Sequence, residues 1–204
     1  MSARAGLTVD RITRAAAALA DEVGIEKVTI SALARTFGVK DASLYSHVRS
    51  LQEVRTRVAI LASGEMNDSL ATAIAGRSGG EALAAFADAY RDYALKHPGR
   101  YAATQLRLDP AKIEDTTAVA RSIELTYAVM RHYGLGEPDL TDAARLLRST
   151  FHGYISIEAA GGFSHPRLVE DSWQKAISAL HMLLEHWPQS AKPENPQEPE
   201  TRKP

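Results

Sequence analysis

Hydrophobic residues recur along this chain at intervals of three and four positions, and no stretch alternates convincingly between apolar and polar residues. This pattern predicts an all-α protein. Glycine and proline residues divide it into segments, as at His97-Pro98 and Asp109-Pro110. Helices are therefore expected over residues 9–23, 30–38, 41–48, 50–75, 81–96, 99–106, 111–133, 139–160 and 166–187.

The first three segments have the features of a helix-turn-helix. Thr8 and Thr29 can cap the first two helices, and Gly38 can adopt the left-handed conformation that a tight turn before the third helix needs. Apolar residues of the second and third helices are expected to share one interior with the first helix: Ile30, Leu33, Phe37, Val39, Leu44 and Val48.

The outward positions of the third segment carry small, hydrogen-bonding and basic side chains. These residue types suit the major groove of DNA and the phosphates beside it. A generic helical hairpin, whose polar residues face only solvent, is the alternative. The positions concerned are Lys40, Ala42, Ser43, Tyr45, Ser46 and His47.

The run from Thr29 to Val48 resembles the DNA-binding domain of TetR-type transcriptional regulators. The resemblance implies a homodimeric repressor that binds a pseudo-palindromic operator. A helix-turn-helix domain over residues 1–50 would be joined by a long helix to a helical dimerisation and ligand-binding domain over residues 51–187. The matching positions are Thr29, Ala34, Gly38, Leu44, Tyr45, His47 and Val48.

The same resemblance implies which side chains hold the DNA backbone. Thr29 would hold a phosphate, either with its hydroxyl or with the helix N-terminus there. Tyr45 and His47 would clamp the backbone, with Tyr45 also reaching a base. Relatives commonly place a lysine at the start of the fourth helix, where this chain has Leu51. Arg49 is expected to replace that contact.

Base contacts are implied for the N-terminal end of the third helix. Lys40, Ala42 and Ser43 are the candidates there, and Ala42 suits a thymine methyl group. Relatives often have a serine or threonine cap where Lys40 stands. Either Asp41 caps the helix instead, or Lys40 reaches the DNA.

The C-terminal segments also carry a partial family pattern. Phe151-His152-Gly153 resembles a subgroup of TetR-type domains with a Trp-His-Gly signature, with phenylalanine in place of tryptophan. The resemblance implies that the last two helices pair with those of a second subunit in a four-helix bundle. The alternative for the last helix is burial within one subunit. Its apolar residues cover more than one stripe: Leu168, Val169, Trp173, Ala176, Ile177, Leu180, Leu183, Leu184 and Trp187.

A ligand cavity in this architecture would lie between the fourth, fifth, seventh and eighth helices. The residues expected there would form an apolar lining with a few polar groups, which suits a mostly apolar effector. The alternative is a solid core in a DNA-binding or protein-interaction module that needs no ligand. The candidate lining residues are Met66, Tyr90, Tyr93, Gln105, Tyr127, Met130, Phe151, His152 and Ile155.

The distribution of charge agrees with a DNA-binding end. The whole chain of 204 residues has a net charge of −1, yet residues 1–60 carry nine Lys/Arg against six Asp/Glu. Residues 61–190 carry twelve against sixteen. A basic head on an acidic body suits a protein that presents one end to a polyanion.

Composition argues against several other classes of protein. The chain has no cysteine, and no apolar run approaches the roughly 18 residues of a membrane span. The first residues lack a secretion signal, so a cytoplasmic location is expected. Its seven histidines form no metalloprotease pair, and no phosphate-binding glycine loop or Gly-x-Ser-x-Gly elbow is present. We expect no enzymatic activity, cofactor or metal, and a disordered proline-rich tail over residues 188–204.

Overall fold

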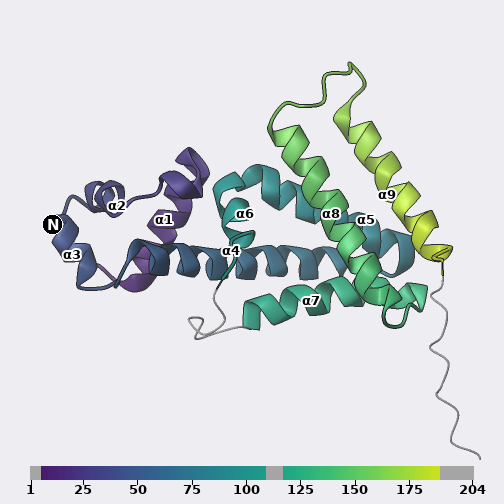
Figure 1. Cartoon of the computed structure of the whole chain (residues 1–204), viewed down its shortest axis with the longest axis horizontal. Helices are drawn as coiled ribbons and strands as arrows, with labels where there is room; N and C mark the ends of the chain where they lie inside the picture. The colour runs from purple at the N-terminus through teal and green to yellow at the C-terminus, as the bar shows by residue number, and fades with distance from the viewer. Residues whose placement is uncertain (1–5, 109–116, 189–204) are drawn as a thin grey trace, which may run out of the picture.

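A computed structural model describes residues 6–108 and 117–188, and throughout these residues the protein is all-α, as the sequence predicts. Figure 1 shows the helices in order. Their bounds are α1 Val9–Val23, α2 Ile30–Phe37, α3 Asp41–Tyr45, α4 Leu51–Ile74, α5 Gly79–Lys96, α6 Pro98–Thr104, α7 Thr117–Met130, α8 Asp139–Ala159 and α9 Val169–Glu185. Short 3₁₀ turns follow α1 at Ile25–Lys27 and α7 at Arg131–Tyr133.

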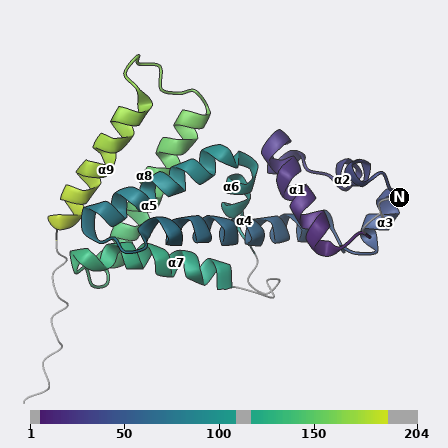
Figure 2. The ribbon, with the colours of Figure 1, turned by 180° about the vertical axis from the view of Figure 1, so that it is seen from behind.

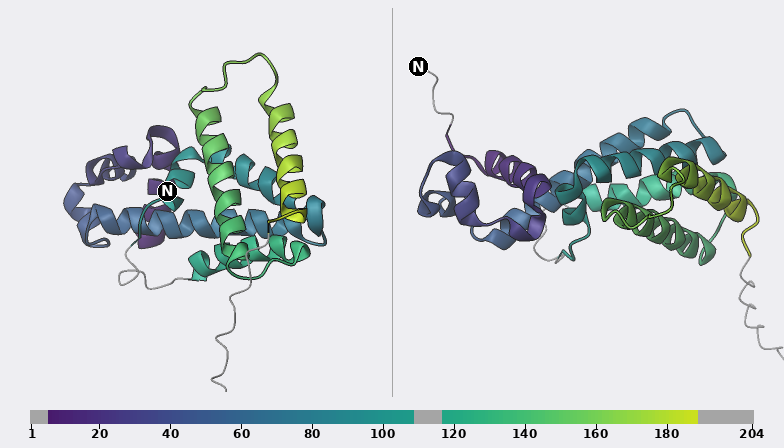
Figure 3. Two further views of the ribbon diagram at one scale, coloured as in Figure 1. Left: turned by 45° about the vertical axis from the view of Figure 1, so that its right-hand side comes forward. Right: turned by 90° about the horizontal axis from the view of Figure 1, so that it is seen from above.

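The molecule is elongated along α4. Helices α1 to α3 form a small unit at one end, and α4 runs from this unit through the larger body (Figure 1). Helices α5, α6 and α7 surround α4, as the opposite view also shows (Figure 2). Helices α8 and α9 project from the body side by side, a feature that both views of Figure 3 preserve. The helix-turn-helix and the α8–α9 pair therefore lie in different parts of the molecule.

Local sequence accounts for the ends of the first two helices. The Thr8 hydroxyl accepts a hydrogen bond from the backbone N–H of Arg11 at 3.2 Å. The Thr29 hydroxyl accepts one from Ala32 at 3.1 Å, which caps α2 in the same way. Gly38 ends α2 in the left-handed conformation with φ of 65°. Both predicted caps and the predicted turn residue are confirmed.

The expectation for the end of the third helix is wrong by three residues. Helix α3 ends at Tyr45 instead of Val48. Ser50 begins the next helix in an extended conformation, with φ of −161° and ψ of 164°, so the chain must leave helical geometry before that point. His47 lies in the connecting turn, where its N–H still bonds to Leu44.

Two hydrophobic clusters stabilise the described residues. The N-terminal cluster is built from α1, α2 and α3 but also includes Val54 and Val58 from α4 and Ala103 from α6. The C-terminal cluster joins α4 to α9 around Phe86, Phe151 and others. The first turns of α4 thus pack with the helix-turn-helix, which ties the orientation of α4 to that unit. Within residues 6–108 and 117–188, none of the helices combines the length and the apolar character of a membrane span.

Other boundaries differ from expectation by at most three residues where the structure describes them, which is the usual scatter at helix ends. The expected start of the seventh helix, over 111–116, lies outside the described residues, as does nearly all of the expected tail.

Candidate nucleic-acid interface and effector region

The proposed DNA-contacting residues lie at the start of α2, along α3 and in the turns that flank α3. Thr29, Lys40, Ala42, Tyr45, His47 and Arg49 are exposed, and Ser43 is half-buried. Tyr45 is the most prominent apolar side chain among them, with 55% of its surface exposed. Its neighbour Leu44 is fully buried and anchors α3 to the N-terminal cluster. The buried Leu44 thus holds α3 on the N-terminal cluster while Tyr45 and His47 beside it are exposed.

Asp41 joins the two helices of the motif. Its carboxylate accepts a hydrogen bond of 2.5 Å from the hydroxyl of Ser31 on α2. Lys40 is the N-cap residue of α3, and no side chain caps that helix. The alternative in which Asp41 caps α3 is therefore wrong, because its carboxylate holds α2 instead. Local sequence gives no sign of this contact between residues ten positions apart.

The start of α4 is fixed by two hydrogen bonds between side chains and backbone N–H groups. The Ser50 hydroxyl accepts from the N–H of Glu53 at 3.1 Å, and the Glu53 carboxylate accepts from the N–H of Arg49 at 2.7 Å. This backbone hydrogen bond, together with the nearby Arg57, lowers the pKa of Glu53. The backbone of Arg49 is thereby held in place while its side chain remains exposed.

Contacts between α1 and α6, which we call the α1–α6 joint, also link the helix-turn-helix to the body. The Asp21 carboxylate on α1 accepts a hydrogen bond from the N–H of Arg100 at 2.9 Å and lies 3.3 Å from Nδ1 of His97. Gly99 between them packs so closely on α1 that an added Cβ would lie 1.9 Å from the carbonyl oxygen of Ala20. Only glycine allows this approach of the two helices.

Six of the residues proposed to line an effector cavity lie in the C-terminal cluster, where they are buried: Met66, Tyr90, Tyr93, Met130, Phe151 and Ile155. The ring centroids of Tyr90 and Phe151 are 5.6 Å apart. Gln105 and Tyr127 are half-buried, and His152 is exposed. Tyr127 lies outside the residues that pack on this cluster. The structure thus brings most of the apolar candidates together.

A chain of hydrogen bonds leads from this cluster to the surface. The Tyr90 hydroxyl lies 3.3 Å from that of Tyr101, which in turn lies 2.7 Å from Nδ1 of His152. Burial raises the pKa of Tyr90 and of Tyr101, so both hydroxyls stay protonated and can donate. Sequence reasoning missed Tyr101, because its position opposite His152 depends on how α6 and α8 are placed relative to each other.

The apolar residues of α9 divide between two faces. Trp173, Ile177, Leu180 and Leu184 are buried within the subunit, whereas Leu183 and Met182 are exposed to 42% and 58%. Ile157 of α8 is exposed as well. We refer to Ile157, near the end of α8, and Met182 and Leu183, near the opposite end of the antiparallel pair, together as the outer face. These side chains leave apolar surface of the α8–α9 pair in contact with solvent.

Comparison with known proteins identifies the class. Residues 12–54 match the description "Bacterial regulatory proteins, tetR family". Residues 83–180 match "Tetracyclin repressor-like, C-terminal domain". The chain is 31% identical over 177 residues to an uncharacterized HTH-type transcriptional regulator, YobS of Bacillus subtilis, covering 87% of this chain and 92% of that protein.

A second relative and a solved structure agree with this result. The uncharacterized HTH-type transcriptional regulator Rv0681 of Mycobacterium tuberculosis is 36% identical over 158 residues, which cover 77% of this chain and 72% of the relative. The crystal structure of BioQ with its double-stranded DNA operator has the same fold, with a TM-score of 0.62 at 20% identity, covering 88% of this chain and 99% of BioQ.

The protein is therefore a helix-turn-helix regulator of transcription with a DNA-binding domain, rather than an enzyme. It belongs to the TetR family.

Proposed function

We propose that this regulator is a repressor that binds a pseudo-palindromic operator as a homodimer in the cytoplasm. The observation that carries the proposal is the exposure of Lys40 and Ala42 near the start of α3 and of Tyr45 at its end, with the half-buried Ser43 between them. A helix of this kind enters the major groove by its N-terminal residues, while side chains around it bind phosphates. Thr29, His47 and Arg49 flank α3 and serve that second role.

The outer face of α8 and α9 supports the dimer. Exposed apolar side chains on two adjacent helices lose their contact with water when a second copy packs on them as a four-helix bundle. A two-fold dimer presents two copies of α3, which match the two halves of a pseudo-palindrome.

We also propose that a small, mostly apolar molecule releases the operator by binding among α4, α5, α7 and α8. The buried aromatic and methionine side chains there would supply the apolar lining. Tyr101 and His152 would supply polar groups at the end that reaches the surface. Because the apolar side chains pack on one another, the ligand must select a conformation in which they separate, and release follows if that conformation disfavours the operator.

The DNA contacts are tested by two substitutions, one that removes a charged contact with phosphate and one that removes an uncharged contact. Arg49→Ala should make the dependence of operator affinity on salt less steep by about one to two in the log–log slope, since a dimer loses two cations. Tyr45→Ala should weaken operator and non-operator DNA alike, by about tenfold or more, with a smaller change in slope. Fluorescence anisotropy titrations over a range of salt concentrations measure both effects.

Arg77→Ala is the matched control for Arg49→Ala, because Arg77 is exposed and follows the opposite end of α4. It should leave both affinity and slope unchanged. A Tyr45→Ala protein that keeps its affinity but changes its base preference would contradict the phosphate role of Tyr45. An Arg49→Ala protein with an unchanged slope would contradict that of Arg49.

A further inference from the structure

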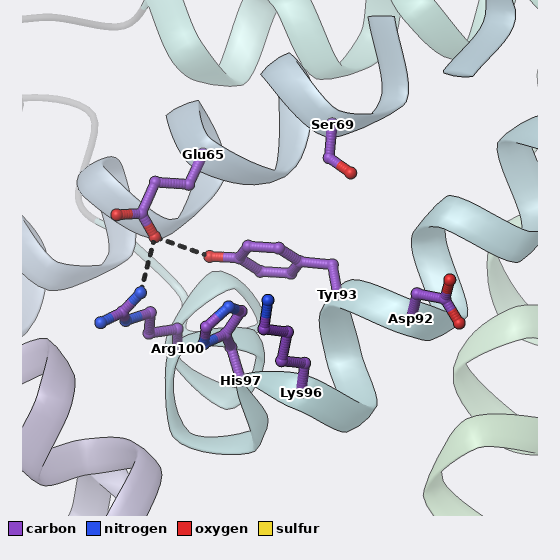
Figure 4. Close-up of a pocket in the computed structure, with 7 residues that line it drawn as sticks. All are labelled: Glu65, Ser69, Asp92, Tyr93, Lys96, His97 and Arg100. Carbon is purple, nitrogen blue, oxygen red and sulfur yellow. Dashed lines mark hydrogen bonds and ion pairs between the residues drawn. The ribbon is translucent and has the colours of Figure 1, made fainter. Parts of the chain in front are cut away.

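A polar cleft lies at the junction of α4, α5 and the turn into α6. Its volume is about 520 Å³, and it is open to solvent. This volume lies within the range of small-molecule sites. The cleft is separate from the buried aromatic cluster proposed to take an apolar effector, although Tyr93 contributes to both. Figure 4 shows its lining, which consists of Glu65, Ser69, Asp92, Tyr93, Lys96, His97 and Arg100.

Part of this lining is already saturated by internal contacts. The Glu65 carboxylate accepts a hydrogen bond from the Tyr93 hydroxyl and lies 3.2 Å from the guanidinium of Arg100. Arg100 and His97 both contact Asp21 of α1. Glu65, Arg100, His97 and Asp21 are therefore already paired with one another and offer a ligand less than unpaired groups do.

The other polar side chains of the cleft have no such partners. Ser69, Asp92 and Lys96 form no hydrogen bond or ion pair with any residue of the described ranges 6–108 and 117–188. Asp92 and Lys96 are one helical turn apart on α5, a spacing at which opposite charges commonly pair with each other. Figure 4 instead shows the two side chains directed to opposite sides of the point where Tyr93 joins the helix. Among the described residues, the cleft thus presents one unpaired cation, Lys96, and one unpaired anion, Asp92.

We propose that this cleft binds a small zwitterion, a molecule that carries both a carboxylate and an ammonium group. The carboxylate would lie on the ammonium group of Lys96, beside His97 and Arg100. The ammonium group would lie on the Asp92 carboxylate and the Ser69 hydroxyl. A molecule with only one of these charges would leave one side of the cleft without a partner and bind more weakly.

The position of the cleft gives binding a consequence for α1. His97 and Arg100 line the cleft, and the same two side chains hold Asp21. A ligand carboxylate beside them competes with Asp21 and weakens the joint between α1 and α6. Because α1 belongs to the helix-turn-helix unit, a weaker joint should change the affinity for the operator. This effect on operator affinity rests on the proposed DNA binding, whereas the binding of the zwitterion does not.

The experiment uses the full chain and a series of ω-amino acids from glycine to 6-aminohexanoate. Thermal unfolding gives the shift of the thermal midpoint that each compound causes, and isothermal titration calorimetry gives its dissociation constant. Each is compared with the unsubstituted carboxylate and the unsubstituted amine of the same length. At about ten times its dissociation constant, at least one ω-amino acid should raise the thermal midpoint by about 3–6 °C. The two single-charge analogues of that length should raise it by less than half as much.

Variants locate the site. Lys96→Gln and Asp92→Asn should each weaken binding by about tenfold or more. Lys175→Gln and Asp171→Asn, which change exposed residues of α9, should leave it unchanged. Failure of every ω-amino acid to bind, equal binding of the single-charge analogues, or undiminished binding by both cleft variants would overturn the proposal. Binding that leaves operator affinity unchanged would overturn only the consequence for α1.

Discussion

Replacing Gly99 with alanine is expected to lower the free energy of unfolding by about 3 kcal/mol and the thermal midpoint by about 6–12 °C. A Cβ at this position would lie 1.9 Å from the carbonyl oxygen of Ala20 and 2.5 Å from the backbone nitrogen of Asp21. These are backbone atoms, so no side-chain rotation relieves the overlap, and α6 must move away from α1. The hydrogen bond from Arg100 to Asp21 would lengthen at the same time.

Gly64→Ala is the matched control for this substitution. Gly64 lies within α4, and a Cβ there would meet nothing within 4 Å. Alanine at an uncrowded position inside a helix stabilises it by about 0.5–1 kcal/mol. Thermal unfolding followed by circular dichroism measures both variants. If Gly99→Ala were as stable as the wild-type protein, the close approach of α1 and α6 would be incorrect.

Combining Met182→Glu with Leu183→Glu is expected to yield a folded monomer whose operator affinity is about 10²- to 10⁴-fold lower. Both side chains belong to the outer face and are more than a third exposed within one subunit, so the charges should leave the subunit folded. In a dimer interface, the introduced glutamates of the two subunits would be buried close to one another, where like charges repel and lose their hydration. The loss of affinity follows because one subunit then binds only half of the operator.

The matched control places two charges on a different exposed apolar pair, Val119→Glu with Ile123→Glu on α7. This variant should remain a dimer with undiminished operator affinity. Light scattering gives the oligomeric state, and anisotropy titration gives the affinity. A double variant of α9 that remains a folded dimer would place the interface elsewhere.

Periodicity alone could not choose the right residues for that experiment. It would have favoured Leu180 and Leu184, which lie among the apolar positions of the last helix. Both are buried within the subunit, at 8% and 1% exposure, so charges there would unfold the protein rather than test the interface. The sequence of such a helix shows two apolar stripes without indicating which one packs within the subunit. The packing of α9 on α5 and α8 identifies that stripe.

Features set by neighbouring residues were predictable. The capping threonines and Gly38 act within a few positions of their own helix, and the exposed residues of α3 follow from its apolar side. Contacts between distant segments were not predictable. Asp41 meets Ser31, and Asp21 meets Arg100 across 79 positions, through geometry that depends on how whole helices pack. The polar cleft depends on the same packing.

The proposed effector residues show a similar division. The apolar candidates do gather, because large apolar residues on inward helix faces must share a core. The polar candidates do not all lie among them: His152 is exposed and is linked to the cluster by its hydrogen bond with Tyr101. Ligand control by this region stays a prediction.

Selection of bound DNA from a random library by the purified full-length protein tests the central proposal most directly. The account predicts enrichment of one pseudo-palindromic sequence whose half-sites are centred about 10–10.5 base pairs apart, or a multiple of that spacing. It also predicts that the α9 double variant no longer requires both halves for its residual binding. Enrichment of a single asymmetric site, or no enrichment above the starting library, would contradict binding by two symmetry-related copies of α3.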